Sequence, residues 1–221
     1  MTTYVLIHGA WAGAWGWDKV AERLRTKGHR VHAPTLSGLG ERSHLANLPI
    51  TLTTHIDDIV NEMVWHDLTD VVLVAHSYGG FVGTGVAERA AERIASIVYL
   101  DAFIPEDGQS FADIMGETPD GPVVPAPEIG NNEYPTEQER MRVAALATPQ
   151  PSGTFTEGLK VTGAYLKIAR KTYIVATGFN HFAPVAAPLR NDPAWTVHEM
   201  PCGHDVPLLL PDELTALLEK A

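Results

Sequence analysis

Residues 71–80 read Val-Val-Leu-Val-Ala-His-Ser-Tyr-Gly-Gly, an apolar run that ends in a turn of the form small-x-Ser-x-Gly. The run predicts a buried strand that ends at Ala75, followed by a helix that begins near Gly79. Ser77 would then lie on a turn so tight that its neighbours must be small. Its hydroxyl group would stand above the strand edge, with a helix N-terminus directed at it. This pattern is typical of a nucleophile elbow, and Ala75 in place of glycine still satisfies the demand for a small side chain.

Length and composition predict one folded domain over residues 1–221, because 221 residues that are 45% hydrophobic suffice for one sizeable core. The formal net charge of −11 argues against nucleic acid or a membrane surface as a partner. Cys202 is the single cysteine, which excludes an internal disulfide and fits a reducing compartment. We recognise neither a signal peptide nor a transmembrane helix and expect a cytoplasmic protein. A monomer and a homodimer both remain open.

Short β-rich apolar runs alternate with helical patterns along the chain, which is typical of βαβ units. We therefore expect an α/β fold with a mostly parallel sheet and helices on both faces. The expected strands are 4–8, 30–33, 71–75, 96–101, 172–177 and 196–200. Outside residues 105–168, the expected helices are 18–27, 54–66, 81–93 and 212–220.

Residues 105–168, here called the insertion segment, interrupt this alternation. The segment is rich in Pro, Gly and acidic residues up to about 135 and then has a helical pattern over 136–147. We expect it to form a short cap over the C-terminal edge of the sheet, where open α/β sheets bind ligands. For its first half, a disordered loop is the alternative.

A serine nucleophile needs a base, and ten histidines are available. His204 is the strongest candidate because its loop follows the last expected strand and therefore lies at the same sheet edge as Ser77. His181 follows the preceding strand and is the alternative base. His76 should point away from the Ser77 side chain if the strand alternation continues into the turn.

The oxyanion of an acyl-transfer intermediate is best stabilised by fixed backbone N–H groups. We expect one from Tyr78, immediately after the nucleophile, and one from Ala10 in the loop after the first strand. Trp11 in the same loop is a candidate to contact substrate at the pocket mouth, whereas Trp15 and Trp17 are expected to be core residues.

Three stretches together resemble the α/β-hydrolase superfamily. They are Tyr-Val-Leu-Ile-His-Gly-Ala-Trp-Ala-Gly-Ala-Trp-Gly-Trp at 4–17, Ala-His-Ser-Tyr-Gly-Gly at 75–80 and Val-Tyr-Leu-Asp-Ala-Phe-Ile-Pro-Glu-Asp-Gly at 98–108. Within the superfamily the chain is similar to the plant methyl-salicylate esterase and hydroxynitrile lyase group and its bacterial esterase relatives. The resemblance implies an α/β-hydrolase fold with about six strands.

The acid of the triad does not stand at the position that the resemblance implies. Family members usually carry Asp a few residues after the strand that corresponds to 172–177, but this chain has Asn180 there. Some dehalogenases of the superfamily place the acid after the preceding strand, which is where Asp101 stands. We therefore predict a Ser77, His204 and Asp101 triad, in the order Ser, acid, His. The alternative for Asp101 is a structural hydrogen bond at the root of the cap.

The predicted function is hydrolysis of a small carboxylic ester, a small-molecule substrate, through an acyl-enzyme intermediate. Amide or carbamate hydrolysis on the same triad is an alternative. A hydroxynitrile lyase is disfavoured because Ala10 and Asp205 replace the Thr and Lys that such enzymes carry, and a non-catalytic binding protein is disfavoured by the retained triad. We expect no cofactor and no metal, because neither His-x-x-x-His on a helix nor a Cys pair occurs. Trp11, Tyr78 and Phe103 suggest an apolar pocket, and we predict that Trp11 and Phe103 bind substrate.

Overall fold

The computed structural model describes residues 1–130 and 133–221. Six parallel strands form one sheet in the order β2-β1-β3-β4-β7-β8. Their bounds are Thr3–Ile7 (β1), Arg30–His32 (β2), Val71–His76 (β3), Ile94–Leu100 (β4), Arg170–Ala176 (β7) and Trp195–Met200 (β8). The expected α/β-hydrolase fold and its strands are confirmed.

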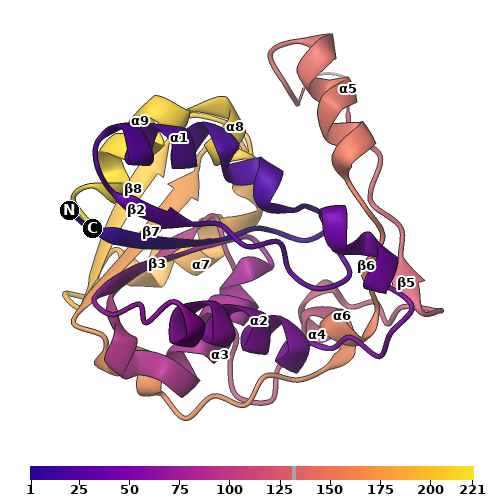
Figure 1. Ribbon diagram of the computed structural model, residues 1–221, viewed down its shortest axis with the longest axis horizontal. Helices are drawn as coiled ribbons and strands as arrows, with labels where there is room; N and C mark the ends of the chain where they lie inside the picture. The colour runs from indigo at the N-terminus through magenta and orange to yellow at the C-terminus, as the bar shows by residue number, and fades with distance from the viewer. Residues whose placement is uncertain (131–132) are drawn as a thin grey trace.

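Helices cover both faces of the sheet, with α1, α8 and α9 on one side and α2 and α3 on the other (Figure 1). Their bounds are Asp18–Thr26 (α1), Leu52–Trp65 (α2), Gly79–Ala90 (α3), Ala183–Leu189 (α7), Val206–Leu209 (α8) and Pro211–Leu218 (α9). A parallel sheet that is covered on both faces requires strands that are apolar throughout, and every residue of β3 is buried.

Two hydrophobic cores result from the alternation of side chains along each strand. Val71 and Leu73 of β3 belong to the core under α2 and α3. Val72 and Val74 belong to the core under α1 and α9. Because each strand contributes to both cores, the ends of the central strands are held rigidly at the sheet edge where the loops emerge.

The insertion segment contains short elements between β4 and β7. These are α4 (Phe111–Met115), β5 (Val123–Val124), α5 (Glu137–Leu146), β6 (Gln150–Pro151) and α6 (Gly153–Thr156), with β5 and β6 paired antiparallel. Helix α5 projects away from the sheet (Figure 1). Two ion pairs join it to α1: Lys19–Glu139 at 2.7 Å and Arg142–Asp18 at 3.5 Å. No helix in the described part of the chain is long and apolar enough to cross a membrane.

Gly80, in the first turn of α3, packs against the backbone that follows β4. A Cβ atom on Gly80 would lie 2.0 Å from the carbonyl oxygen of Phe103. At Gly16, by contrast, an added Cβ would meet no atom within 4 Å.

Gly80→Ala should therefore lower the free energy of unfolding by about 3 kcal/mol, because the backbone of Phe103 must move to admit the methyl group. Gly16→Ala is the matched control and should change stability by less than about 0.5 kcal/mol. Urea unfolding followed by circular dichroism measures both. Equal effects of the two substitutions would contradict the close packing of α3 on the chain after β4.

Candidate active site

Ser77 occupies the turn between β3 and α3 in a left-handed conformation, with φ of 56°. The conformation is held by its own backbone: the carbonyl oxygen of Ser77 accepts hydrogen bonds from Gly80 N at 2.9 Å and Phe103 N at 3.3 Å. A non-glycine residue in this region is strained by about 1–3 kcal/mol and persists only where its surroundings determine it. The strained turn leaves the Ser77 side chain partly exposed at the sheet edge.

The loop after β1 lies directly against this turn. A Cβ atom on Gly9 would lie 3.1 Å from Ser77 Cβ and 3.3 Å from His76 Nδ1. A Cβ atom on Gly79 would lie 2.8 Å from the carbonyl oxygen of His8. Glycine is therefore needed both in the β1 loop, at Gly9, and in the turn after Ser77, at Gly79. The close contact between them brings the β1 loop to the Ser77 hydroxyl group.

His204 forms a close contact with Asp101, which follows β4. His204 Nδ1 lies 2.7 Å from Asp101 Oδ2, and the carboxylate is fully buried. A carboxylate accepts hydrogen bonds, so Nδ1 carries the proton and Nε2 is left with a free lone pair. The other carboxylate oxygen, Oδ1, accepts a hydrogen bond from Ala176 N at 2.9 Å. Asp101 is thus held by β7 and the His204 ring is oriented by Asp101.

Aromatic rings surround the imidazole of His204. Phe182 stacks on it with ring centroids 5.3 Å apart and an interplanar angle of 12°, and the ring of Phe179 lies 4.9 Å away. His76 lies 4.6 Å away, and its Nε2 is 3.0 Å from the carbonyl oxygen of His204. Burial lowers the pKa of His76 to about 4. This second imidazole is therefore neutral at pH 7 and supports the His204 loop through its Nε2–H group.

Two backbone N–H groups border the Ser77 turn: Tyr78 directly follows Ser77, and Ala10 follows Gly9, which packs against Ser77. Those of Ala10 and Tyr78 make no hydrogen bond within the described residues. The Ala10 loop is fixed by His8, whose Nδ1 donates to Gly9 O at 2.8 Å while Nε2 accepts from Leu36 N at 3.0 Å. Tyr78 directly precedes α3, so its N–H group shares the positive end of that helix. Both expected donors are thus free to bind an oxygen atom.

A cavity of about 640 Å³ opens above Ser77 and His204. Trp11 lines it, and the Trp11 indole N–H donates to Val124 O at 3.2 Å. From the insertion segment, Tyr134 and Val143 line the cavity. Ser77 and His204 face one space, although Ser77 Oγ makes no hydrogen bond to His204 within the described residues. Such contacts often tighten only when substrate binds.

Other predicted residues lie elsewhere. Phe103 is 5% exposed and packs against other aromatic rings, 5.2 Å from Phe111 and 4.7 Å from Phe182. It is absent from the residues that line the cavity. Asn180 and His181 are exposed and lie in the turn after β7. Trp17 is buried as expected, whereas Trp15 lines the cavity.

Several residues at the site were missed by the sequence reasoning. His76 was set aside on the strand alternation, and its ring does lie on the Val72 and Val74 face of β3, against Trp17. It still lines the cavity, because the His204 loop borders that face and the His76 and His204 rings lie 4.6 Å apart. Phe179 and Asp205 line the cavity too. The Tyr134 hydroxyl group donates to the Asp205 carboxylate. No sequence pattern signals this contact, which joins the insertion segment to the His204 loop across 71 residues.

A family model described as the alpha/beta hydrolase family matches residues 4–217 of the chain. The chain is 38% identical over 242 residues to the carbendazim hydrolyzing esterase of Nocardioides sp. (strain SG-4G), an alignment that covers 99% of this chain and 98% of that protein. It is 35% identical to methylesterase 10 of Arabidopsis thaliana over 116 residues, which are 52% of this chain and 42% of that one.

Two solved structures share the fold. An extracellular alpha/beta-hydrolase from a Paenibacillus species, described as sharing structural and functional homology with tobacco salicylic acid binding protein 2, is 26% identical to this chain. Its TM-score is 0.81, and the match covers 100% of this chain and 99% of that one. A methylesterase from Arabidopsis has a TM-score of 0.82 at 21% identity, with 100% of this chain and 98% of its own covered.

Stability should fall steeply on mild acidification, because burial lowers the pKa of His8, His55 and His76 to about 4 from 6.5. Between these values the unfolded chain binds protons that the folded chain excludes, so the free energy of unfolding decreases as the pH falls from about 6.5 to 4. Each imidazole contributes a slope of up to about 1.4 kcal/mol per pH unit.

Urea unfolding between pH 7.5 and 4.5 measures this slope. His55→Gln removes one buried imidazole and should reduce the histidine contribution by about a third. His44→Gln, the same substitution at an exposed histidine, is the control for the change of side chain. A slope that His55→Gln does not alter would contradict a neutral, buried His55.

Proposed function

The chain belongs to the alpha/beta hydrolase family and is a carboxylic ester hydrolase, and from this premise we propose that Ser77, His204 and Asp101 are its catalytic triad. The observation that carries the assignment is the 2.7 Å contact between His204 Nδ1 and the buried Asp101 carboxylate. Asp101 follows β4, whereas Asn180 follows β7, the neighbouring strand of the sheet. In this assignment the acid comes from the loop after β4.

In the first half of the reaction, His204 Nε2 accepts the Ser77 proton as Oγ attacks the ester carbonyl. Asp101 stabilises the imidazolium ion that forms. The N–H groups of Ala10 and Tyr78 bind the oxyanion of the tetrahedral intermediate. His204 then returns the proton to the departing alcohol, and an acyl-enzyme remains on Ser77.

In the second half, a water molecule replaces the alcohol. His204 accepts a proton from the water, the hydroxide attacks the acyl carbonyl, and the proton returns to Ser77 as the carboxylic acid leaves. His76 does not compete for these protons, because burial holds its pKa at about 4.

We propose that the preferred substrates are small esters without negative charge, and that the insertion segment forms the roof of their site. The lining combines apolar side chains such as Trp11 and Val143 with the carboxylates of Glu128, Glu133 and Asp205. Neither Lys nor Arg is among the described residues that line the cavity. An anionic acyl group would therefore meet like charges with no cation to offset them.

Asp101→Asn should lower kcat for p-nitrophenyl acetate by about 10⁴-fold, because the amide cannot stabilise the imidazolium ion and favours the wrong tautomer. Ser77→Ala should abolish turnover, so that only the background rate of hydrolysis without enzyme remains. Asn180→Ala should change kcat by less than about threefold. Steady-state kinetics test all three. A large loss in Asn180→Ala together with a small loss in Asp101→Asn would assign the acid elsewhere.

The p-nitrophenyl ester of acetate should be cleaved with a higher kcat/KM than the hemisuccinate ester, by about tenfold or more. Carbendazim belongs in the same panel because the Nocardioides relative is named for its hydrolysis. Any cleavage of carbendazim should be lost in Ser77→Ala. Such a loss would assign carbamate hydrolysis, the alternative reaction, to the same triad. Equal kcat/KM for the acetate and the hemisuccinate would contradict the charge argument.

A further inference from the structure

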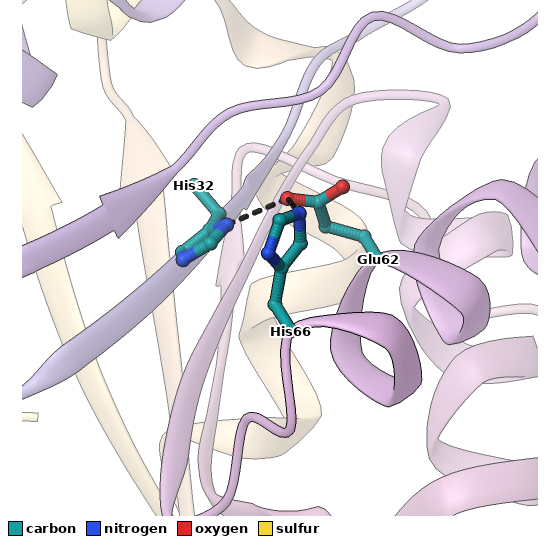
Figure 2. Close-up of side chains that lie close together, drawn as sticks. All are labelled: His32, Glu62 and His66. Atoms are coloured by element: carbon teal, nitrogen blue, oxygen red, sulfur yellow. Dashed lines mark hydrogen bonds and ion pairs between the residues drawn. The ribbon is translucent and has the colours of Figure 1, made fainter.

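His32, Glu62 and His66 form a cluster on the surface, apart from the cavity above Ser77. His32 is the last residue of β2, Glu62 lies in the final turn of α2 and His66 is the residue that follows the helix. None of the three lines the cavity. In Figure 2 the two imidazole rings converge on one carboxylate oxygen of Glu62 from different elements.

The three donor atoms are close enough to bind one ion. His32 Nδ1 lies 2.6 Å from Glu62 Oε1, and His66 Nε2 lies 3.5 Å from the same oxygen. The three ligand atoms, one from each residue, all lie within 4.8 Å of one another. Nitrogen and oxygen ligands lie about 2.0–2.2 Å from zinc, so two ligands at a tetrahedral angle are about 3.3–3.5 Å apart. The His66–Glu62 separation matches this spacing, and the His32–Glu62 separation needs to lengthen by less than about 1 Å.

We propose that His32, Glu62 and His66 bind a divalent transition-metal ion of the zinc type. Two imidazole nitrogens and one carboxylate oxygen suit Zn²⁺, Co²⁺ or Ni²⁺ better than Mg²⁺ or Ca²⁺, which prefer oxygen ligands alone. Three protein ligands leave the fourth tetrahedral position to water. On binding, the Nδ1 proton that His32 shares with Glu62 moves to Nε2, so the neutral imidazole exchanges one tautomer for the other.

The surroundings favour a cation. His66 is the C-terminal cap of α2, where the free carbonyl groups give the helix end partial negative charge. Two arginines lie near this end: Arg30 Nη2 is 3.5 Å from His66 O, and Arg93 Nη1 is 2.9 Å from Leu68 O and 3.6 Å from the Asp67 carboxylate. The Arg30 contact neutralises one carbonyl group while it holds the helix end against β2. The imidazole of His66 itself is exposed and free to turn toward the ion.

A bound ion would tie an edge strand to the helix that covers it. β2 has three residues and pairs only with β1 among the described strands. Through His32 and Glu62 the ion would close a loop of 30 residues between β2 and α2. Its effect would therefore be on stability at the sheet edge and not on ester hydrolysis.

The test is isothermal titration of ZnCl₂ into the full chain after treatment with a chelator, with the melting temperature measured in parallel. We expect one Zn²⁺ per chain and a rise in the melting temperature of about 5 °C at zinc 100-fold above Kd. His66→Ala and His32→Gln should each weaken binding at least about tenfold and reduce the rise. Hydrolysis of p-nitrophenyl acetate by the metal-free variants should equal that of the wild type.

His29→Gln is the matched control, because His29 also lies beside a glutamate, 3.4 Å from Glu219, but shares it with Lys27 instead of a second histidine. This variant should bind zinc as the wild type does. The proposal is overturned if the wild type binds no zinc, if His66→Ala and His32→Gln retain full affinity, or if His29→Gln loses it equally. Zinc that only inhibits hydrolysis, with the same potency in His66→Ala, would place the ion at His204 and also overturn the proposal.

Discussion

Ser77 holds a backbone conformation that side chains of L-amino acids disfavour, and much of the surrounding structure keeps it there. The carbonyl oxygen of Ser77 is bonded to α3 and to the chain after β4. The glycines at 9, 79 and 80 let three segments approach the turn more closely than any side chain would allow. If the turn relaxed, the hydroxyl group would leave the cavity and the N–H group of Tyr78 would lose its direction.

Asp101 has the same kind of backbone conformation at the end of the adjacent strand, β4. Its φ is 42°, again left-handed, and its backbone N donates to Ile174 O at 2.6 Å. Two consecutive parallel strands thus end in strained turns at the same edge of the sheet. The second turn directs a carboxylate inward, where Ala176 N and His204 hold it. The sheet supplies the rigidity that lets two unfavourable conformations persist side by side.

The strands could be predicted from the sequence because the covered ones contain long apolar runs, such as residues 71–75. Asp101 and His204 were predicted as site residues from their positions after strands. Helix α7 was not predicted, because Pro188 disfavours a helix interior, although Pro184 lies in the first turn, where proline is tolerated. The helix packs through the buried Ala186. Phe103 was expected to contact substrate, but its side chain, in the chain after β4, packs within the aromatic core. His32 stands 30 residues from Glu62, so no local spacing could reveal their contact.

The attachment of α5 to the rest of the molecule has an evolutionary consequence. The helix is joined to α1 by two ion pairs at the surface, and pairs of this kind contribute about 0–1 kcal/mol each. Ser77, His204 and Asp101, by contrast, are fixed by the sheet. Apart from changes at the buried Val143, mutations in α5 can therefore reshape the proposed roof of the cavity at little cost to folding. A lineage could acquire new substrates in this way while the proposed triad stayed the same.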